Sequence, residues 1–236
     1  MPTLKDVAEK SGVTVTTVSR VLNNRGYISD ATRKKVYDAM KELNYHPNEM
    51  ARSLTKKRTN MIGVIVPSIS HPFFSKVVSC LEYYAAQKGY KIMLCNSHHE
   101  REKEIGYFDM LRSNKVAGIV MCSRTERVTD DLDITLPVVL FERALSGDFS
   151  TISCDNYEGG HIAVMHLIEK GCHNLLYIGG PEKIPLPANL RGQAFQDVCE
   201  QYHVRHMMIT TEEEQFHNMD YTGLIEEVLK AHPEID

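Results

Sequence analysis

The sequence predicts a small all-helical N-terminal domain followed by a larger parallel α/β core that is divided into two lobes. Three observations support this fold class. Short segments with helical spacing of apolar residues fill the first part of the chain, apolar strands alternate with helices from Met61 onward, and a new series of strands begins after Gly147. A length of 236 residues suits one small and one or two medium domains. The predicted boundaries are residues 1–47 for the helical domain, 48–60 for a linker, 61–146 for the first lobe and 147–236 for the second.

The first predicted helix begins at Leu4. Thr3 can cap it through its hydroxyl, and Asp6 stands at the capping-box position that reaches back to the Thr3 backbone. Gly12 is suited to end this helix, because glycine adopts the left-handed conformation of a helix cap without steric cost. Thr14 can then cap a second helix, so that the two form a helix-turn-helix.

The second helix separates its apolar residues from its polar ones. Its inward face is expected to hold Val18, Val21 and Leu22. The residues left near its exposed N-terminal end are Val15, Thr16, Thr17, Ser19 and Arg20. Short hydroxyl and methyl groups beside an arginine are what a helix needs to read base edges in a DNA groove. The spacing alone fits an ordinary surface helical hairpin equally well.

A third helix completes the predicted N-terminal domain. Ser29 can cap it, and it runs to about Leu43 with Val36 and Met40 on its inner side. The basic run 33–35 lies outward near its start, where it suits either solvent or a phosphate.

The linker that follows holds a short helical signal. Pro47 favours a break, and Asn48 can cap one or two further turns. A helix this short is marginal in water unless a partner supports it. The alternative is therefore a plain flexible linker.

The remainder of the chain alternates between strand and helix patterns. The first lobe is expected to hold strands in MIGVIVP, KIMLCNS, GIVMCS and PVVLFE, with helices over 72–88 and 100–112. The second lobe is expected to hold strands in TISCD, LLYIGGP and HMMITT, with helices over 157–169, 188–202 and 220–231. This alternation implies parallel sheets covered on both faces, whose ligands bind beyond the carboxyl ends of the strands.

Charge and composition narrow the function classes. Residues 1–60 hold 12 Lys and Arg against 6 Asp and Glu, whereas the remainder holds 15 against 25. Because the first 60 residues are basic and the remainder is acidic, we expect only the N-terminal part to contact phosphates. The six cysteines form no C-x-x-C pair and favour reduced thiols in the cytoplasm, and the sequence has neither an apolar signal core nor a membrane-length apolar run. No metal-ligand spacing, cofactor motif or catalytic string is present, so we expect no cofactor and no enzyme activity.

The strings DVAEKSGVTVTTVSRVLN and ISDATRKKVYDAMKELNYHPNEMARSL closely resemble the DNA-reading segment of the lactose/galactose/purine repressor family of bacterial transcription regulators. The resemblance implies that the linker is a hinge helix, ordered when two protomers lie side by side in the DNA minor groove, and that Leu54 wedges between base pairs. Val15, Thr16 and Arg20 would read bases. The expected DNA contacts are Thr3, Thr14, Val15, Thr16, Thr17, Arg20, Asn23, Tyr45, Asn48, Ala51, Arg52, Leu54 and Thr55.

The same resemblance implies a periplasmic-binding-protein-like core with an effector held between its lobes. Relatives continue past Asp236, so the second lobe is expected to be incomplete. His71 stands where the family often has Asn, and DNYEGG is a family hallmark. The expected effector contacts are Ser68, His71, Phe73, Phe74, Glu142, Arg143, Asp155, Arg191 and Phe216.

The sequence therefore predicts a homodimeric repressor of a carbohydrate-utilisation operon, nearest to sucrose- and ribose-type repressors. It would bind a pseudo-palindromic operator and respond to a sugar or sugar phosphate, without a membrane partner. One alternative is a carbon-catabolite regulator controlled by a phosphocarrier protein. Another is a truncated product with impaired effector binding.

Overall fold

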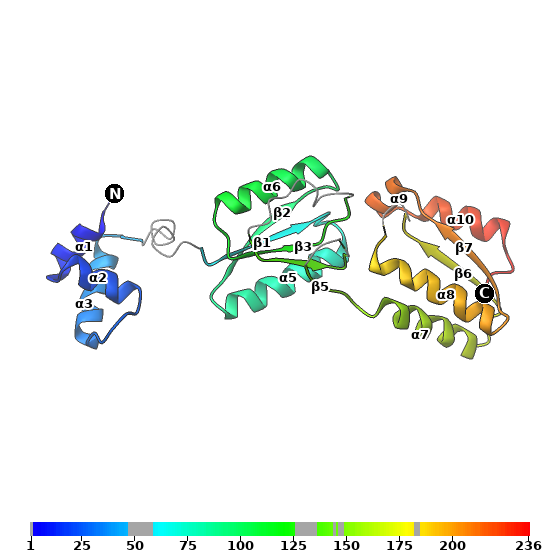
Figure 1. The fold of residues 1–236 in the computed structure, drawn as a ribbon, viewed down its shortest axis with the longest axis horizontal. Coiled ribbons are helices and arrows are strands. Elements are labelled where there is room, and N and C mark those ends of the chain that lie inside the picture. The colour runs from blue at the N-terminus through cyan, green and yellow to red at the C-terminus, as the bar shows by residue number, and fades with distance from the viewer. Residues whose placement is uncertain (1, 47–58, 126–135, 144, 146–148, 182–184) are drawn as a thin grey trace. The chain divides into compact units, whose positions relative to one another are not determined.

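The computed structural model divides the chain into two compact units, Met1–Lys57 and Arg58–Asp236 (Figure 1). It describes residues 2–46, 59–125, 136–143, 145, 149–181 and 185–236, the side chains of Glu213, Phe216 and His217 excepted. The predicted hinge helix falls on residues 47–58 and so lies outside the described residues.

The first unit is the predicted three-helix domain. Its helices are α1 (Leu4–Ser11), α2 (Val15–Leu22) and α3 (Asp30–Glu42). One core joins them, because Val7, Val18 and Val36 are all fully buried and pack in a single cluster. Apolar residues at helical spacing thus bury one stripe of each helix and leave the polar face outside.

The helix caps expected in this unit are present. Thr3 and Asp6 form the capping box of α1, and Gly12 ends that helix with φ 67°, in the left-handed region. The hydroxyls of Thr14 and Ser29 accept hydrogen bonds from the first turns of α2 and α3. These caps satisfy backbone N–H groups that a helix start otherwise leaves without partners.

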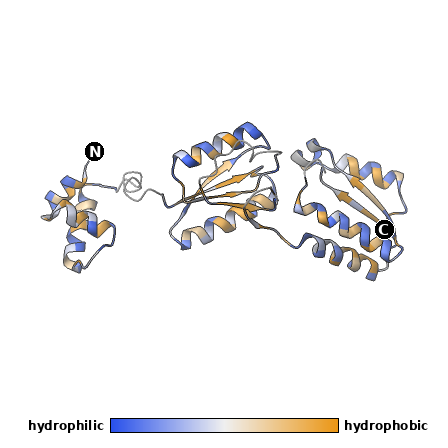
Figure 2. Cartoon of the chain, viewed as in Figure 1, coloured by the Kyte–Doolittle hydropathy of each residue, from blue (hydrophilic) through white to orange (hydrophobic). Residues whose placement is uncertain are grey.

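The second unit contains a five-stranded parallel sheet. Its strands are β1 (Met61–Val66), β2 (Lys91–Asn96), β3 (Gly118–Met121), β4 (Val138–Phe141) and β5 (Ser150–Ile152), in the order β2-β1-β3-β4-β5. Figure 2 shows hydrophobic residues along these strands, as expected for a sheet with covered faces.

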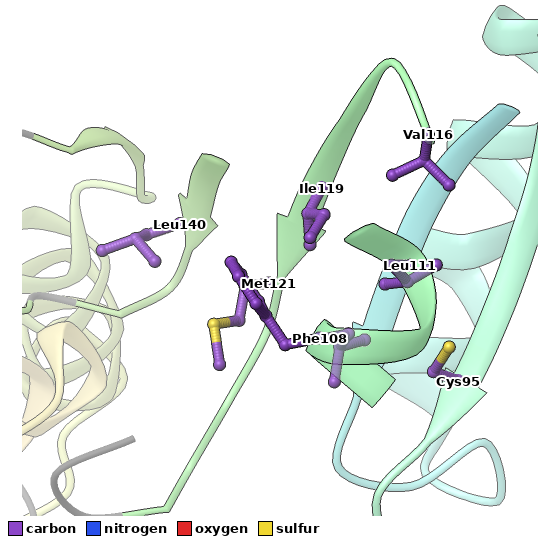
Figure 3. Close-up of a cluster of buried hydrophobic side chains, with 8 residues drawn as sticks. Cys95, Phe108, Leu111, Val116, Ile119, Met121 and Leu140 are labelled. Atoms are coloured by element: carbon purple, nitrogen blue, oxygen red, sulfur yellow. The ribbon is translucent and has the colours of Figure 1, made fainter. Parts of the chain in front are cut away.

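Helices α5 (Pro72–Gln87) and α6 (Arg101–Ser113) cover opposite faces of this sheet (Figure 1). Strand β1 alternates accordingly, since Ile65 belongs to the cluster that contains Phe108 of α6, whereas Val64 packs in the cluster that contains Phe74 of α5. Figure 3 shows the α6 side, where Phe108 and Leu111 lie near the side chains of β3.

Strand β5 differs from the prediction. The segment TISCD was expected to open the second lobe, but residues 150–152 pair with β4 in the first sheet. All three residues are exposed, so no hydrophobic pattern marks the sheet to which they belong. The crossing between the lobes therefore follows β5, and α7 (Asn156–Glu169) begins the second lobe.

The second lobe is built around the parallel pair β6 (Asn174–Gly179) and β7 (Arg205–Thr210). Its other helices are α8 (Leu190–Gln201), preceded by a short 3-10 turn (Pro187–Asn189), α9 (Glu213–Asn218) and α10 (Thr222–Ala231). Val164, Leu175 and Phe195 form a core between α7, β6 and α8. Helix α9 was not predicted, whereas the bounds of the five predicted helices in this unit agree within two residues.

Candidate functional site

The outward face of α2 carries the side chains expected to read DNA. Val18 and Val21 hold the helix against the core, and this rotation leaves Val15 42% exposed beside the exposed Thr16 and Arg20. The pattern follows from the spacing, since residues three and four apart share a helix face. A valine, a hydroxyl and a guanidinium therefore meet solvent together.

The exposed residues that flank this face make local hydrogen bonds at the ends of the helices. Thr3 donates its backbone N–H to Asp6 Oδ2 at 2.6 Å, and this bond, with a second from the Thr3 hydroxyl, lowers the pKa of Asp6. Thr14 accepts from the Thr17 N–H at 3.1 Å, and the Asn23 amide donates to the Ser19 carbonyl at 2.8 Å.

Tyr45 instead packs against the core of the first unit, although its side chain is not fully buried. Five further residues expected to contact DNA lie outside the described residues: Asn48, Ala51, Arg52, Leu54 and Thr55.

The second unit contains a cavity of about 290 Å³ where the carboxyl ends of the strands meet, and we call it the strand-end cavity. Such ends are where open parallel sheets bind ligands. It is lined by His71, Phe73, Phe74, Cys122, Arg124, Phe141, Glu142, Tyr177, Ile178, Gly179, Gly180, Leu186, Ala188, Asn189 and Arg191.

Five of the nine residues expected to contact an effector line this cavity: His71, Phe73, Phe74, Glu142 and Arg191. Ser68, Arg143 and Asp155 do not line it. Asp155 borders a neighbouring pocket and caps α7, and the side chain of Phe216 lies outside the described residues.

One wall of the cavity is aromatic. Phe74 is only 5% exposed and packs in the core, whereas Phe73 is 37% exposed with its ring centroid 6.1 Å from that of Phe141. Phe73 is therefore the ring of the pair that is free to stack on a ligand. His71 Nδ1 accepts the Phe73 N–H at 3.2 Å, and burial, with the nearby Arg124 charge, lowers the pKa of this imidazole. The neutral ring thus makes the cap that an Asn side chain would make.

A second part of the cavity lining is polar, and hydrogen bonds connect its side chains. Glu142 accepts the Cys154 N–H at 2.5 Å on one carboxylate oxygen and the Asn156 amide at 3.0 Å on the other. The Asn156 carbonyl oxygen in turn accepts from Arg191 Nε at 2.7 Å. A carboxylate and a guanidinium therefore face the cavity as one hydrogen-bonded chain. Asn156 was absent from the expected site, and its only sequence signal was the DNYEGG string.

A buried polar cluster forms around Ser123 and Thr125, the residues on either side of Arg124 in sequence, and of its members only Arg143 was expected at the effector site. Glu104 is fully buried and accepts hydrogen bonds from Ser97 at 3.0 Å, from Ser123 at 2.7 Å and from Thr125. Arg143 is also buried and donates to the Thr125 carbonyl at 2.9 Å. The cluster thus secures the segment that presents Arg124 to the cavity.

The described residues show neither a metal site nor a membrane span. No group of three or more His, Cys, Asp and Glu among them is placed to hold a metal ion. No helix in the described part of the chain is both long and apolar enough to cross a bilayer. The side chains that line the strand-end cavity can form hydrogen bonds, ion pairs and ring-stacking contacts.

Two protein families match the chain. Residues 3–48 match the family described as bacterial regulatory proteins, lacI family. Residues 59–236 match periplasmic binding proteins and sugar binding domain of LacI family. The first match covers the three helices, and the second covers both lobes.

Several relatives of the chain are named as sugar operon repressors. The sucrose operon repressor of Streptococcus mutans is 40% identical over 204 residues, which are 86% of this chain and 64% of that protein. The ribose operon repressor of Halalkalibacterium halodurans is 35% identical over 236 residues, which are 100% of this chain and 70% of that protein. The chain spans 60% of the sucrose operon repressor of Pediococcus pentosaceus, so it is shorter than these relatives.

Two solved structures of transcriptional regulators have folds similar to that of this chain. The Lac repressor dimer bound to operator and the anti-inducer ONPF superposes with a TM-score of 0.77 at 26% identity, covering 89% of this chain and 64% of that one. A periplasmic binding protein/LacI transcriptional regulator from Alkaliphilus metalliredigens, complexed with D-xylulofuranose, has a TM-score of 0.62 at 37% identity and covers 72% of this chain and 64% of that one.

Proposed function

The chain belongs to the lacI family of bacterial regulatory proteins, and on that premise we propose that it represses a carbohydrate-utilisation operon by binding operator DNA. The observation that carries the proposal is the exposed face of α2, where Val15, Thr16 and Arg20 project from a packed three-helix core. The relatives that are named as sucrose and ribose operon repressors support the proposal of a carbohydrate-utilisation operon.

The first unit would enter the DNA major groove with α2. Arg20 can bind a guanine edge with two parallel hydrogen bonds, while Val15 and Thr16 contact methyl groups and polar base edges. Thr3, Thr14, Thr17 and Asn23 would position the backbone. Two copies of the chain would read the two halves of a pseudo-palindrome, with the linkers paired in the minor groove between them.

The strand-end cavity would bind the effector. Its volume of about 290 Å³ lies near the lower end of the range for small-molecule pockets, which suits a sugar or sugar phosphate. Phe73 would stack on the apolar face of the ring, and Glu142 and Arg191 would bind hydroxyl or phosphate oxygens. Because residues of both lobes line the cavity, effector binding would change the angle between the lobes. In a dimer, this change would alter the distance between the hinge segments of the two protomers.

We place this activity in the cytoplasm, where bacterial operator DNA lies. The cysteines are free thiols, three of them buried, which fits a reducing compartment.

Selection of duplexes from a random DNA pool by the purified chain tests the DNA-binding proposal. We expect enrichment of a pseudo-palindrome whose half-sites lie one helical turn apart. Recovery of random sequences would refute operator binding.

Calorimetry with sucrose, D-ribose, D-fructose and their phosphate esters tests the effector proposal. We expect one of these compounds to bind and to change operator affinity. If none produces heat while operator binding persists, control by a phosphocarrier protein becomes the better account.

A further inference from the structure

We propose that Asn156 is a positioning residue of the effector site, because its buried amide fixes both Glu142 and Arg191 where they face the strand-end cavity. This inference rests on the proposed function, in which those two charged groups bind the effector. Asn156 itself does not line the cavity. It would act through its two partners.

The amide of Asn156 is matched to both neighbours at once. It is 2% exposed, and its nitrogen donates to Glu142 Oε2 at 3.0 Å and to the Cys154 carbonyl at 3.2 Å. Its oxygen accepts from Arg191 Nε at 2.7 Å. An amide offers donors on one side and acceptors on the other, so it can bond a carboxylate and a guanidinium simultaneously. Neither a carboxylate nor a hydrocarbon side chain can replace it in both roles.

Glu142 is held in a costly conformation that this bonding supports. Its φ of 50° lies in the left-handed region, which non-glycine residues enter at a cost and mainly at functional sites. The Glu142 N–H donates to the Ile152 carbonyl at 2.9 Å, while the carboxylate accepts from Cys154 and Asn156. Backbone and side chain are thus anchored to β5 and to the residues that follow it.

Arg191 is brought to Asn156 by a close helix contact. Gly160 lies one turn after Asn156 on α7, and a Cβ built on it would stand 2.7 Å from the Arg191 carbonyl oxygen and 3.0 Å from Ala194 Cβ. Only a glycine therefore allows α7 and α8 to approach this closely. The approach sets the reach of the Asn156 amide to the guanidinium.

One amide consequently joins three segments: the end of β4, the crossing between the lobes and the start of α8. An effector that binds Glu142 and Arg191 would meet groups whose directions Asn156 has already set, which reduces the ordering cost of binding.

An exchange of carboxylate and amide tests the arrangement without any ligand. In the full chain, Asn156→Asp places two carboxylates within hydrogen-bond distance of each other, so we expect a lower melting temperature. Adding Glu142→Gln restores one donor and one acceptor to the pair in reversed order, so the double variant should melt above Asn156→Asp alone. A double variant that melts at or below the single one would overturn the arrangement.

Effector binding tests the role. We expect Asn156→Ala to weaken binding of whichever sugar or sugar phosphate from the calorimetry panel binds the native chain by at least about tenfold, well below its melting temperature. The control is Asn114→Ala, because the Asn114 amide bonds the Met110 carbonyl of its own helix at 2.8 Å and lies outside the cavity. Asn156→Ala binding as tightly as the native chain would overturn the positioning role. If no compound in the panel binds the native chain, the effector proposal fails, whereas the exchange experiment still decides the contact.

Discussion

Gly159 and Gly160 are adjacent in sequence but have opposite surroundings. A Cβ at Gly159 would meet nothing within 4 Å, whereas one at Gly160 would collide with the backbone of α8 at Arg191. The DNYEGG string that both belong to therefore holds one glycine that packing requires and one that it does not.

We predict that Gly160→Ala destabilises the second unit by about 1–3 kcal/mol, because the methyl group must push α7 and α8 apart. Gly159→Ala is the matched control and should be neutral or stabilising by up to about 1 kcal/mol, since alanine is the better helix former. Chemical denaturation of both variants measures this. Equal effects at the two positions would show that the α7–α8 contact is not as close as described.

At this scale the sequence predicted side chains that stand at the ends of strands and failed for buried polar ones. Phe73 and Glu142 follow the ends of strands, where ligands of parallel sheets bind. Arg191 was expected only from the family resemblance, because it lies at the start of α8. Asn156 was indicated only by the DNYEGG string and Glu104 was not predicted, because their partners lie far away in sequence and only the folded sheet brings them together. Polar residues at helix starts are usually exposed, so burial gave no local signal.

Among the elements, the helices of the first unit owe their bounds to their caps. Thr3 bonds the first turn of α1, and its loss leaves a backbone N–H without that partner. We predict that Thr3→Ala destabilises the first unit by about 1 kcal/mol, and that Thr3→Ser, which keeps the hydroxyl, costs much less. Amide hydrogen exchange of α1 in the full chain measures the loss. Equal exchange in the two variants would mean that the hydroxyl contributes little.

Asp6 makes the same cap depend on pH. Its pKa is lowered from 3.8 in the folded chain, chiefly by the Thr3 backbone N–H, so its stabilising effect is complete above the unfolded pKa. That effect is lost as pH falls through the lowered folded pKa. We predict that the first unit weakens in acid below about pH 4, and that Asp6→Asn removes this part of the pH dependence. An unchanged acid profile in the variant would contradict this.

The type of an element could be predicted from the sequence where hydrophobic periodicity was strong. The prediction was wrong where that periodicity was absent. The caps and stripes of α1, α2 and α3 predicted those helices closely. Strand β5 has three exposed residues, so only its hydrogen bonds to β4 assign it to the first sheet.

For the whole molecule, charge is unevenly divided, with 12 Lys and Arg against 6 Asp and Glu in residues 1–60 and 15 against 25 in the remainder. We predict steeply salt-dependent DNA binding, because cations that neutralise phosphates release bound counterions. For a dimer with about 6–10 phosphate contacts, affinity should fall about 10³–10⁵-fold between 50 and 200 mM salt. Fluorescence anisotropy across that range measures how affinity depends on salt concentration. An affinity that does not change with salt would exclude phosphate contacts by residues 1–60.

The most direct measurement for the account as a whole is the ratio of operator affinity to bulk-DNA affinity after removal of one arginine from α2. We predict that Arg20→Ala lowers this ratio, and that the free-energy difference between operator and bulk-DNA binding shrinks by about 1–3 kcal/mol, since base contacts to one sequence are lost. Arg25→Ala removes the same charge beyond the end of α2 and should weaken binding to both DNAs alike. If Arg20→Ala also weakened both equally, α2 would not read bases, and the assignment of its exposed face would be contradicted.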